Sequence, residues 1–132
     1  GKSSGKSYWE IRIDAVDNGP TGNALNVGVW PVSMDIGTYI YNTSGVRRLY
    51  QTMNVGDVIG VAFDADAGTC SIYQNGVSLG QVDGSPLTIS EPWHAVVGDD
   101  NYGDAVLTAN FGTTPFAYSP PEGYTAGLYE TS

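Results

Sequence analysis

The strongest indication of the fold class of this chain is the segment Val58-Ile59-Gly60-Val61-Ala62-Phe63-Asp64. Its residues are apolar at successive positions, which is typical of a strand that is buried on both faces in the middle of a sheet. The turn former Gly56-Asp57 precedes it, and Asp66-Ala67-Gly68-Thr69 follows it as a tight turn. We therefore expect residues 58–64 to form the central strand of the core.

A second hairpin follows this strand. Cys70–Gln74 and Val77–Val82 have the composition of strands, and Asn75-Gly76 between them is the strongest short hairpin signal in the sequence. Further short strands are predicted at Leu25–Trp30, Ile40–Tyr41, Val46–Tyr50, Trp93–Val97 and Val106–Phe111. The tail, residues 115–121, contains prolines and alternate aromatic residues, and we expect it to form an extended segment at a sheet edge.

The N-terminal segment Tyr8–Asp14 alternates strictly between apolar and charged residues. Trp9, Ile11 and Ile13 fall on one face, whereas Glu10, Arg12 and Asp14 fall on the other. This pattern predicts a strand that is buried on one face only, with Trp9 as a core anchor.

The composition supports an all-β chain with a single domain. In 132 residues there are 18 glycines and 7 prolines, so a helix breaker falls about every fifth position and long helices are excluded. Short strands at spacings of about ten residues, separated by turn formers, favour an antiparallel β-sandwich. Because the chain starts at Gly1 without an initiator Met, we expect residues 1–132 to be one domain of a longer protein.

The charge argues against some classes of partner. The chain has 14 acidic and 5 basic residues and a net charge of −9, which repels nucleic acid and anionic membranes. The longest apolar stretch, Val58–Phe63, is too short to insert into a membrane. Cys70 is the single cysteine, so the fold does not depend on an internal disulfide.

Three stretches of the sequence resemble the SPRY domain family. They are Gly5-Lys6-Ser7-Tyr8-Trp9-Glu10-Ile11, then residues 54–64, then Gly68-Thr69 through Tyr73-Gln74-Asn75-Gly76-Val77-Ser78-Leu79-Gly80. The closing Thr108-Ala109-Asn110-Phe111-Gly112, followed by Pro115-Phe116, is similar to the forms of this domain found in bacteriophage and bacterial proteins. The resemblance extends from about residue 5 to residue 124.

The resemblance implies a bent sandwich of two antiparallel sheets without catalytic machinery. It implies a recognition module whose loops at one edge hold a partner, most often a protein or peptide. For the phage-like form it implies an adhesion or display domain at a virion or extracellular surface, with a protein or a cell-surface glycan as partner. Family members usually carry one or two strands before the Gly5 segment, so we expect those strands to be missing here or to be supplied by another chain or segment.

Carried over by position, the recognition edge falls on the loops 17–23, 31–50 and 98–104. Tyrosine offers amphipathic contact area at low entropic cost, and adjacent arginines can pair with a carboxylate on a ligand or with an acid of this chain. The predicted ligand-binding residues are Asn18, Thr21, Tyr39, Tyr41, Arg47, Arg48, Tyr50, Asp99, Asp100, Asn101 and Tyr102.

We expect no catalytic residue, no cofactor and no required metal. His94 lacks a nucleophile in a Gly-x-Ser-x-Gly context, and Cys70 has no basic neighbour in the sequence to lower its pKa, so we interpret both as structural. Asp99, Asp100 and Asp104 are candidate calcium ligands, and Asp64-Ala65-Asp66 is similar to the start of a calcium loop. We favour ordinary turn chemistry for both groups of acids.

Two other functions stay open at this stage. An architectural domain of a particle would contact sibling subunits, and an incomplete sheet would accept a strand from a neighbour. A glycoside hydrolase would need a pair of carboxylates, for which Asp64 with Asp66 or Asp99 with Asp100 are the candidates.

Overall fold

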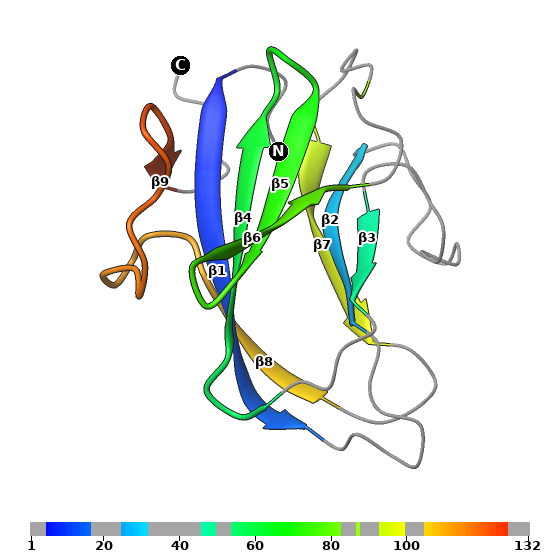
Figure 1. Cartoon of the computed structure of the whole chain (residues 1–132), viewed down its shortest axis with the longest axis vertical. Helices are drawn as coiled ribbons and strands as arrows, with labels where there is room; N and C mark the ends of the chain where they lie inside the picture. The colour runs from blue at the N-terminus through cyan, green and yellow to red at the C-terminus, as the bar shows by residue number, and fades with distance from the viewer. Residues whose placement is uncertain are drawn as a thin grey trace.

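The computed structural model describes residues 5–16, 25–31, 46–49, 54–82, 87, 93–99 and 105–126. These residues form two sheets that pack face to face (Figure 1). The strands are β1 (Lys6–Val16), β2 (Leu25–Pro31), β3 (Val46–Leu49), β4 (Val58–Asp64), β5 (Thr69–Gln74), β6 (Val77–Gln81), β7 (Trp93–Asp99), β8 (Ala105–Asn110) and β9 (Thr125–Ala126). The predicted strand at 40–41 lies outside the described residues.

The larger sheet has the strand order β6-β5-β4-β1-β8, and its long strands pair antiparallel. The short β9 pairs parallel with the start of β1. As predicted, β4 is central and every one of its residues is buried. The hairpin turn between β5 and β6 has positive φ at both Asn75 and Gly76, as a two-residue turn of the Asn-Gly type requires.

The smaller sheet has the order β3-β2-β7 and is also antiparallel. Its side chains Val27, Val29 and Trp93 face the larger sheet and join the core. From the larger sheet the core receives Trp9, Ile11 and Ile13 of β1 together with the inward residues of β4 and β5. The all-β sandwich predicted from the sequence is therefore confirmed, and so is Trp9 as a fully buried anchor.

The larger sheet bends along β1. The register of β1 with β8 shifts between Ile13 and Ala15, which is an irregularity of the β-bulge kind. Bulges bend a strand and increase its twist. Figure 1 shows the last part of β1 and the start of β8 turning toward the lower end of the smaller sheet.

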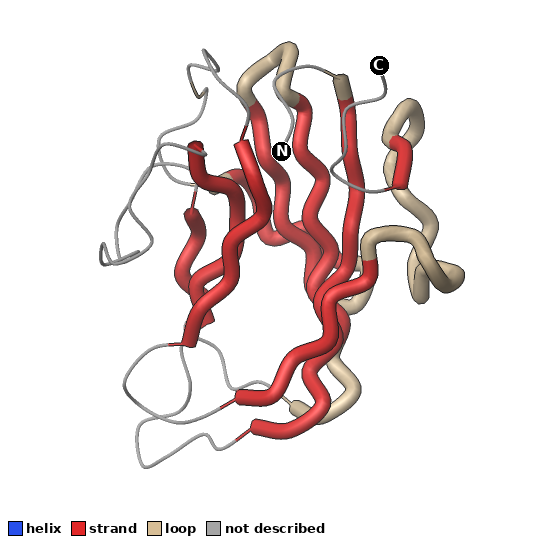
Figure 2. The backbone as a smooth tube through the Cα atoms, turned by 180° about the vertical axis from the view of Figure 1, so that it is seen from behind, coloured by secondary structure: helices blue, strands red, loops and turns tan. Residues whose placement is uncertain are grey.

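The prediction that β1 is buried on one face only is wrong for its first half. Glu10 is 4% exposed and Tyr8 is 2% exposed, although both lie on the face opposite the core. Residues 115–121, which we call the strap, cover this outer face. Figure 2 shows the strap as loop on the side of the larger sheet away from the smaller one. The expectation that residues 115–121 lie at a sheet edge is therefore wrong, because the strap lies over a sheet face.

The outer layer forms because Glu10 attracts strap amides. Its carboxylate accepts hydrogen bonds from the backbone N–H groups of Ala117 at 2.8 Å and Tyr118 at 3.0 Å. The ring of Phe116 meets that of Tyr8 edge to face, with centroids 4.9 Å apart. Alternate aromatic residues in the tail thus pack onto a sheet face, where the sequence pattern alone suggested an edge.

The turn before β4 is held by Asp57. Its carboxylate accepts hydrogen bonds from the Asn54 N–H at 3.0 Å and from the Asn75 side-chain amide at 3.1 Å. Burial alone would raise the pKa of Asp57, but these hydrogen bonds and one from Gln74 outweigh it and hold the pKa below its ordinary value of 3.8. The ionised form of Asp57 is therefore the one that the fold favours.

This gives a testable dependence of stability on pH. Because the pKa of Asp57 is lower in the folded chain, its contribution is complete above the unfolded value and is lost as the pH falls through the folded value. Urea denaturation of the wild type from about pH 6 to about pH 2 should show this loss below pH 3.8, and Asp57→Asn should show a shallower decline. Equal slopes for the two proteins would show that Asp57 has no such role.

Candidate functional site

The ends of the predicted binding loops lie together at one end of the sandwich. In the smaller sheet Leu25 pairs with both Leu49 and Asp99, so the residues that border three segments are neighbours. In the larger sheet Val16 pairs with Ala105, and these residues border two of the same segments. The segments 17–24 and 100–104 therefore both connect this corner of the larger sheet with the same end of the smaller one.

The segment 50–53 also has both of its bordering residues near this corner. Residues 50–53 lead from Leu49 to Asn54, and the next turn is tied to β1, since Gly56 N–H donates to Ile13 C=O at 2.8 Å. By contrast, residues 32–45 start at Pro31, which pairs with Trp93 at the opposite end of β2. The strand register thus brings together the borders of the predicted loops 17–23 and 98–104. Of the predicted loop 31–50, only the C-terminal end lies near them.

Most of the predicted binding residues lie outside the described residues. The structure places the backbone of three of them, Arg47 and Arg48 in β3 and Asp99 at the end of β7. Arg47 is opposite Val27 and Arg48 is opposite Asn26 in the register. Those outside the described residues are Asn18, Thr21, Tyr39, Tyr41, Tyr50, Asp100, Asn101 and Tyr102.

Of the acids considered as calcium ligands or as a glycosidase pair, Asp64 and Asp66 have side-chain contacts that the structure describes. Asp64 accepts hydrogen bonds from the N–H groups of Asp66 and Ala67 at 3.1 Å each, which is the side-chain-to-backbone contact of a turn. Asp66 accepts one from Gly5 N–H at 3.1 Å. Turn chemistry therefore accounts for this pair, whereas Asp100 and Asp104 lie outside the described residues.

Within the described ranges, no three His, Cys, Asp or Glu side chains gather as a metal site would require. The same ranges contain no helix with the length and apolar character needed to cross a membrane. Cys70 is fully buried in the core, and burial raises the pKa of its thiol. His94 pairs with Trp30 across β7 and β2, and its buried Nε2 has no hydrogen-bond partner among the described residues.

The outer face of the larger sheet holds side chains that the sequence reasoning did not select. Along β1 this face carries Lys6, Tyr8, Glu10, Arg12 and Asp14 at alternate positions. Across the sheet, Glu10 pairs with Gly60, which in turn pairs with Tyr73. Because Gly60 has no side chain, the hydroxyl of Tyr8 lies over it, 2.6 Å from where a Cβ would be.

Tyr8 and Glu10 form one buried polar unit. The Tyr8 hydroxyl donates to the Glu10 carboxylate at 2.9 Å, so this carboxylate has three donors including the two strap amides. Burial raises the pKa of Tyr8, and the hydrogen bond and the negative charge of Glu10 raise it further. The phenol therefore stays protonated and the carboxylate keeps its donors.

Two pockets lie along the strap. The tyrosine pocket, with a volume of about 350 Å³, is lined by Tyr8, Tyr73, Gly76, Tyr118, Ser119 and Pro121. The Arg12 pocket, of about 270 Å³, is lined by Glu10, Arg12, Val58, Thr108, Ala109, Asn110, Thr113, Thr114, Pro115 and Ala117. The first volume lies within the range of ordinary ligand sites, and the second falls just below it.

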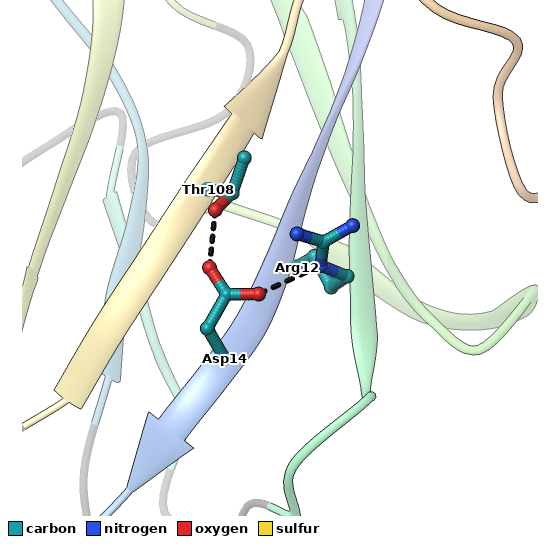
Figure 3. Close-up of polar contacts among 3 residues, drawn as sticks. All are labelled: Arg12, Asp14 and Thr108. Atoms are coloured by element: carbon teal, nitrogen blue, oxygen red, sulfur yellow. Dashed lines mark hydrogen bonds and ion pairs between the residues drawn. The ribbon is translucent and has the colours of Figure 1, made fainter.

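The wall of the Arg12 pocket is fixed by an exposed polar bridge. Asp14 accepts hydrogen bonds from the Thr108 hydroxyl and from Arg12 Nε, the latter at 2.7 Å (Figure 3). The Thr108 bond and then the Arg12 bond lower the pKa of Asp14. The Arg12 guanidinium is thus already paired, so this pocket offers little charge to an anionic ligand.

Two signals in the sequence could have indicated this outer face. A glycine stands in the middle of the apolar stretch 58–64, and it is opposite a glutamate in the alternating strand. A glycine inside a buried strand often marks a close approach by another group. The second signal is the aromatic residues of the strap, which are apolar enough to pack onto a sheet face. Phe116 packs against Tyr8, and the Tyr8 hydroxyl lies over Gly60.

The contact between Glu10 and the strap can be tested by Glu10→Gln. Glutamine has the same shape but only one acceptor oxygen, so a strap amide loses its partner, at a cost of about 1–3 kcal/mol. Hydrogen exchange at the Ala117 and Tyr118 amides should become faster. Glu122→Gln is the control, because Glu122 is exposed, and it should leave both amides unchanged. Slow exchange in Glu10→Gln would show that the strap is held by other contacts.

Comparison of the sequence with protein-family models and with characterised proteins gives no match. Among solved structures, the SPRY domain of human HERC1 is similar, with a TM-score of 0.61 and 15% sequence identity over 86% of this chain and 79% of that chain. At this identity the likeness concerns the fold. The chain therefore has a SPRY-like β-sandwich fold, as the resemblance of its sequence implied.

Proposed function

We propose that the chain is a non-catalytic recognition module that binds a protein or peptide through the loops at one end of the sandwich. The observation that carries this proposal is the register of the strands, which makes Leu25, Leu49 and Asp99 neighbours and pairs Val16 with Ala105. Loops that start from a rigid scaffold at adjacent points are well suited to form one binding surface. The SPRY-like fold supports the same class of function.

The finer form of the proposal is an adhesion or display domain of a phage structural protein. It rests on the resemblance of residues 108–116 to phage and bacterial forms of the domain. A cell-surface glycan is then a second possible ligand class. The net charge of −9 supports a protein partner over nucleic acid, because a polyanion would be repelled.

The test uses two probes, a random peptide library and a glycan array, each screened against the intact chain. Replacing Tyr50 and Tyr102, which follow the bordering Leu49 and Asp99 in the sequence, by alanine should abolish binding of the selected probe and leave the melting temperature nearly unchanged. Tyr118→Ala is the control, because Tyr118 belongs to the strap, and it should retain binding. Intact binding in the double variant, with a large loss of stability, would contradict the assignment.

One observation favours a second candidate, an architectural domain that contacts sibling subunits. Among the described strands, β8 ends the larger sheet with no neighbour on its far side, and Val106 in it is 59% exposed. An open edge strand can accept a strand from another chain. Sizing the isolated chain at increasing concentration distinguishes the candidates, since the architectural role predicts self-association and a recognition module predicts a monomer.

A further inference from the structure

The tyrosine pocket combines three phenol rings with a nearby negative charge. Tyr8, Tyr73 and Tyr118 line it, and the Glu10 carboxylate lies directly behind the Tyr8 hydroxyl. The three tyrosines come from β1, β5 and the strap, so the pocket exists only because the strap is fastened over the sheet. The pocket lies on the outer face, apart from the loop end discussed above.

The charge of Glu10 is not balanced by a cation in the described part of the chain. Its hydrogen bonds come from two backbone amides and one phenol, and the ion pair formed on this face is that of Arg12 with Asp14. Lys6, the other cation of the face, lies 5.7 Å from the ring centroid of Tyr124. Both cations of the face therefore already have a partner outside the tyrosine pocket.

The lining explains which ligand chemistry would fit. Aromatic faces attract ammonium groups through the ring quadrupole, and this attraction grows where water is excluded. Lys6 and Tyr124 already make such a contact on the same face. A net charge of −9 adds a long-range attraction for cations. An anionic ligand would find no cation among the residues that line the pocket, and the Glu10 carboxylate behind Tyr8 would repel it.

We propose that the tyrosine pocket binds a lysine side chain of a partner polypeptide, with the ammonium group held between Tyr73 and Tyr118, next to the buried Tyr8. The four methylene groups of lysine would contact Pro121 and the ring of Tyr118. Gly76 is needed at the rim because a Cβ there would lie 2.8 Å from Cδ1 of Tyr118. This site is independent of the loop end, so either can fail without the other.

The test is a titration of the isotope-labelled chain, followed by amide chemical shifts. The probes are lysine capped as its Nα-acetyl, N-methylamide derivative, the same compound with a trimethylated side-chain ammonium group, and the norleucine analogue, whose side chain has no charge. Both cationic probes should shift the amides of Tyr73, Gly76, Tyr118 and Ser119. The norleucine probe should bind several-fold more weakly. Equal binding by norleucine, or shifts that avoid these four amides, would overturn the proposal.

Variants separate the cation contact from simple packing. Tyr73→Leu keeps an apolar side chain but removes the ring, and it should weaken the lysine probe about two- to fivefold. Tyr73→Phe keeps the ring and should retain most of the binding. Tyr124→Leu is the matched control because Tyr124 contacts Lys6 outside the pocket. If Tyr73→Leu fails to fold, Tyr118→Leu gives the same test from the strap. Unchanged binding in the leucine variant would overturn the proposal.

Discussion

Replacing Trp9 by alanine is expected to lower the free energy of unfolding by about 3–5 kcal/mol. Trp9 is 0% exposed, and its ring centroid lies 6.0 Å from that of Phe111, which packs against the core. Removing the indole leaves a cavity between the two sheets that the neighbouring strands cannot fill. Since a domain of this size is stable by only about 5–15 kcal/mol, a large share of its stability would be lost.

Guanidinium denaturation followed by far-UV circular dichroism measures this loss without depending on tryptophan emission. Val77→Ala is the control, because Val77 is 65% exposed on β6 and should change stability by less than about 0.5 kcal/mol. A Trp9→Ala midpoint close to that of Val77→Ala would mean that Trp9 does not anchor the core.

The second large effect is expected for Gly68→Ala, at about 2–5 kcal/mol. Gly68 has a φ of +73°, which is costly for any residue with a Cβ. In addition, the new Cβ would overlap the carbonyl oxygen of Leu87 and lie 2.9 Å from its nitrogen. This backbone contact is close because Leu87 N–H donates to Gly68 C=O at 2.6 Å.

The variant Gly56→Ala separates the backbone strain of a positive φ from the steric overlap of an added Cβ. Gly56 has a φ of +93° but nothing within 4 Å of an added Cβ, so it should lose only the conformational cost of about 1–2 kcal/mol. Equal losses of stability for the two variants in urea denaturation would show that the contact of Gly68 with Leu87 contributes nothing.

Much of the fold could be predicted from local patterns. The apolar stretch at 58–64 predicts a central strand, and Asn75-Gly76 predicts the hairpin because both need positive φ. These signals depend on short segments, so they can be interpreted without knowing the rest of the chain. The start of β1 could not be predicted in the same way, because Glu10 is buried by a segment that lies 107 residues later.

The candidate site also depends on contacts between distant segments, which local sequence patterns do not predict. The gathering of loop borders follows from the pairing of Leu25 with Leu49 and Asp99, which turn signals alone do not specify. The tyrosine pocket depends on three segments and on the absence of a side chain at Gly60. Neither feature has a compact sequence motif, since each arises from strand register and from the path of the strap.

Chemical-shift mapping can show whether recognition takes place at the loop end. The tightest peptide from the library is added to the isotope-labelled chain, and the shifted amides are assigned. If the loop end binds the peptide, we expect shifts in residues 17–24 and 99–104 and at the bordering Leu25 and Leu49. Shifts confined to the outer face around Tyr73 and the strap, or to the edge strand β8, would contradict recognition at the loop end.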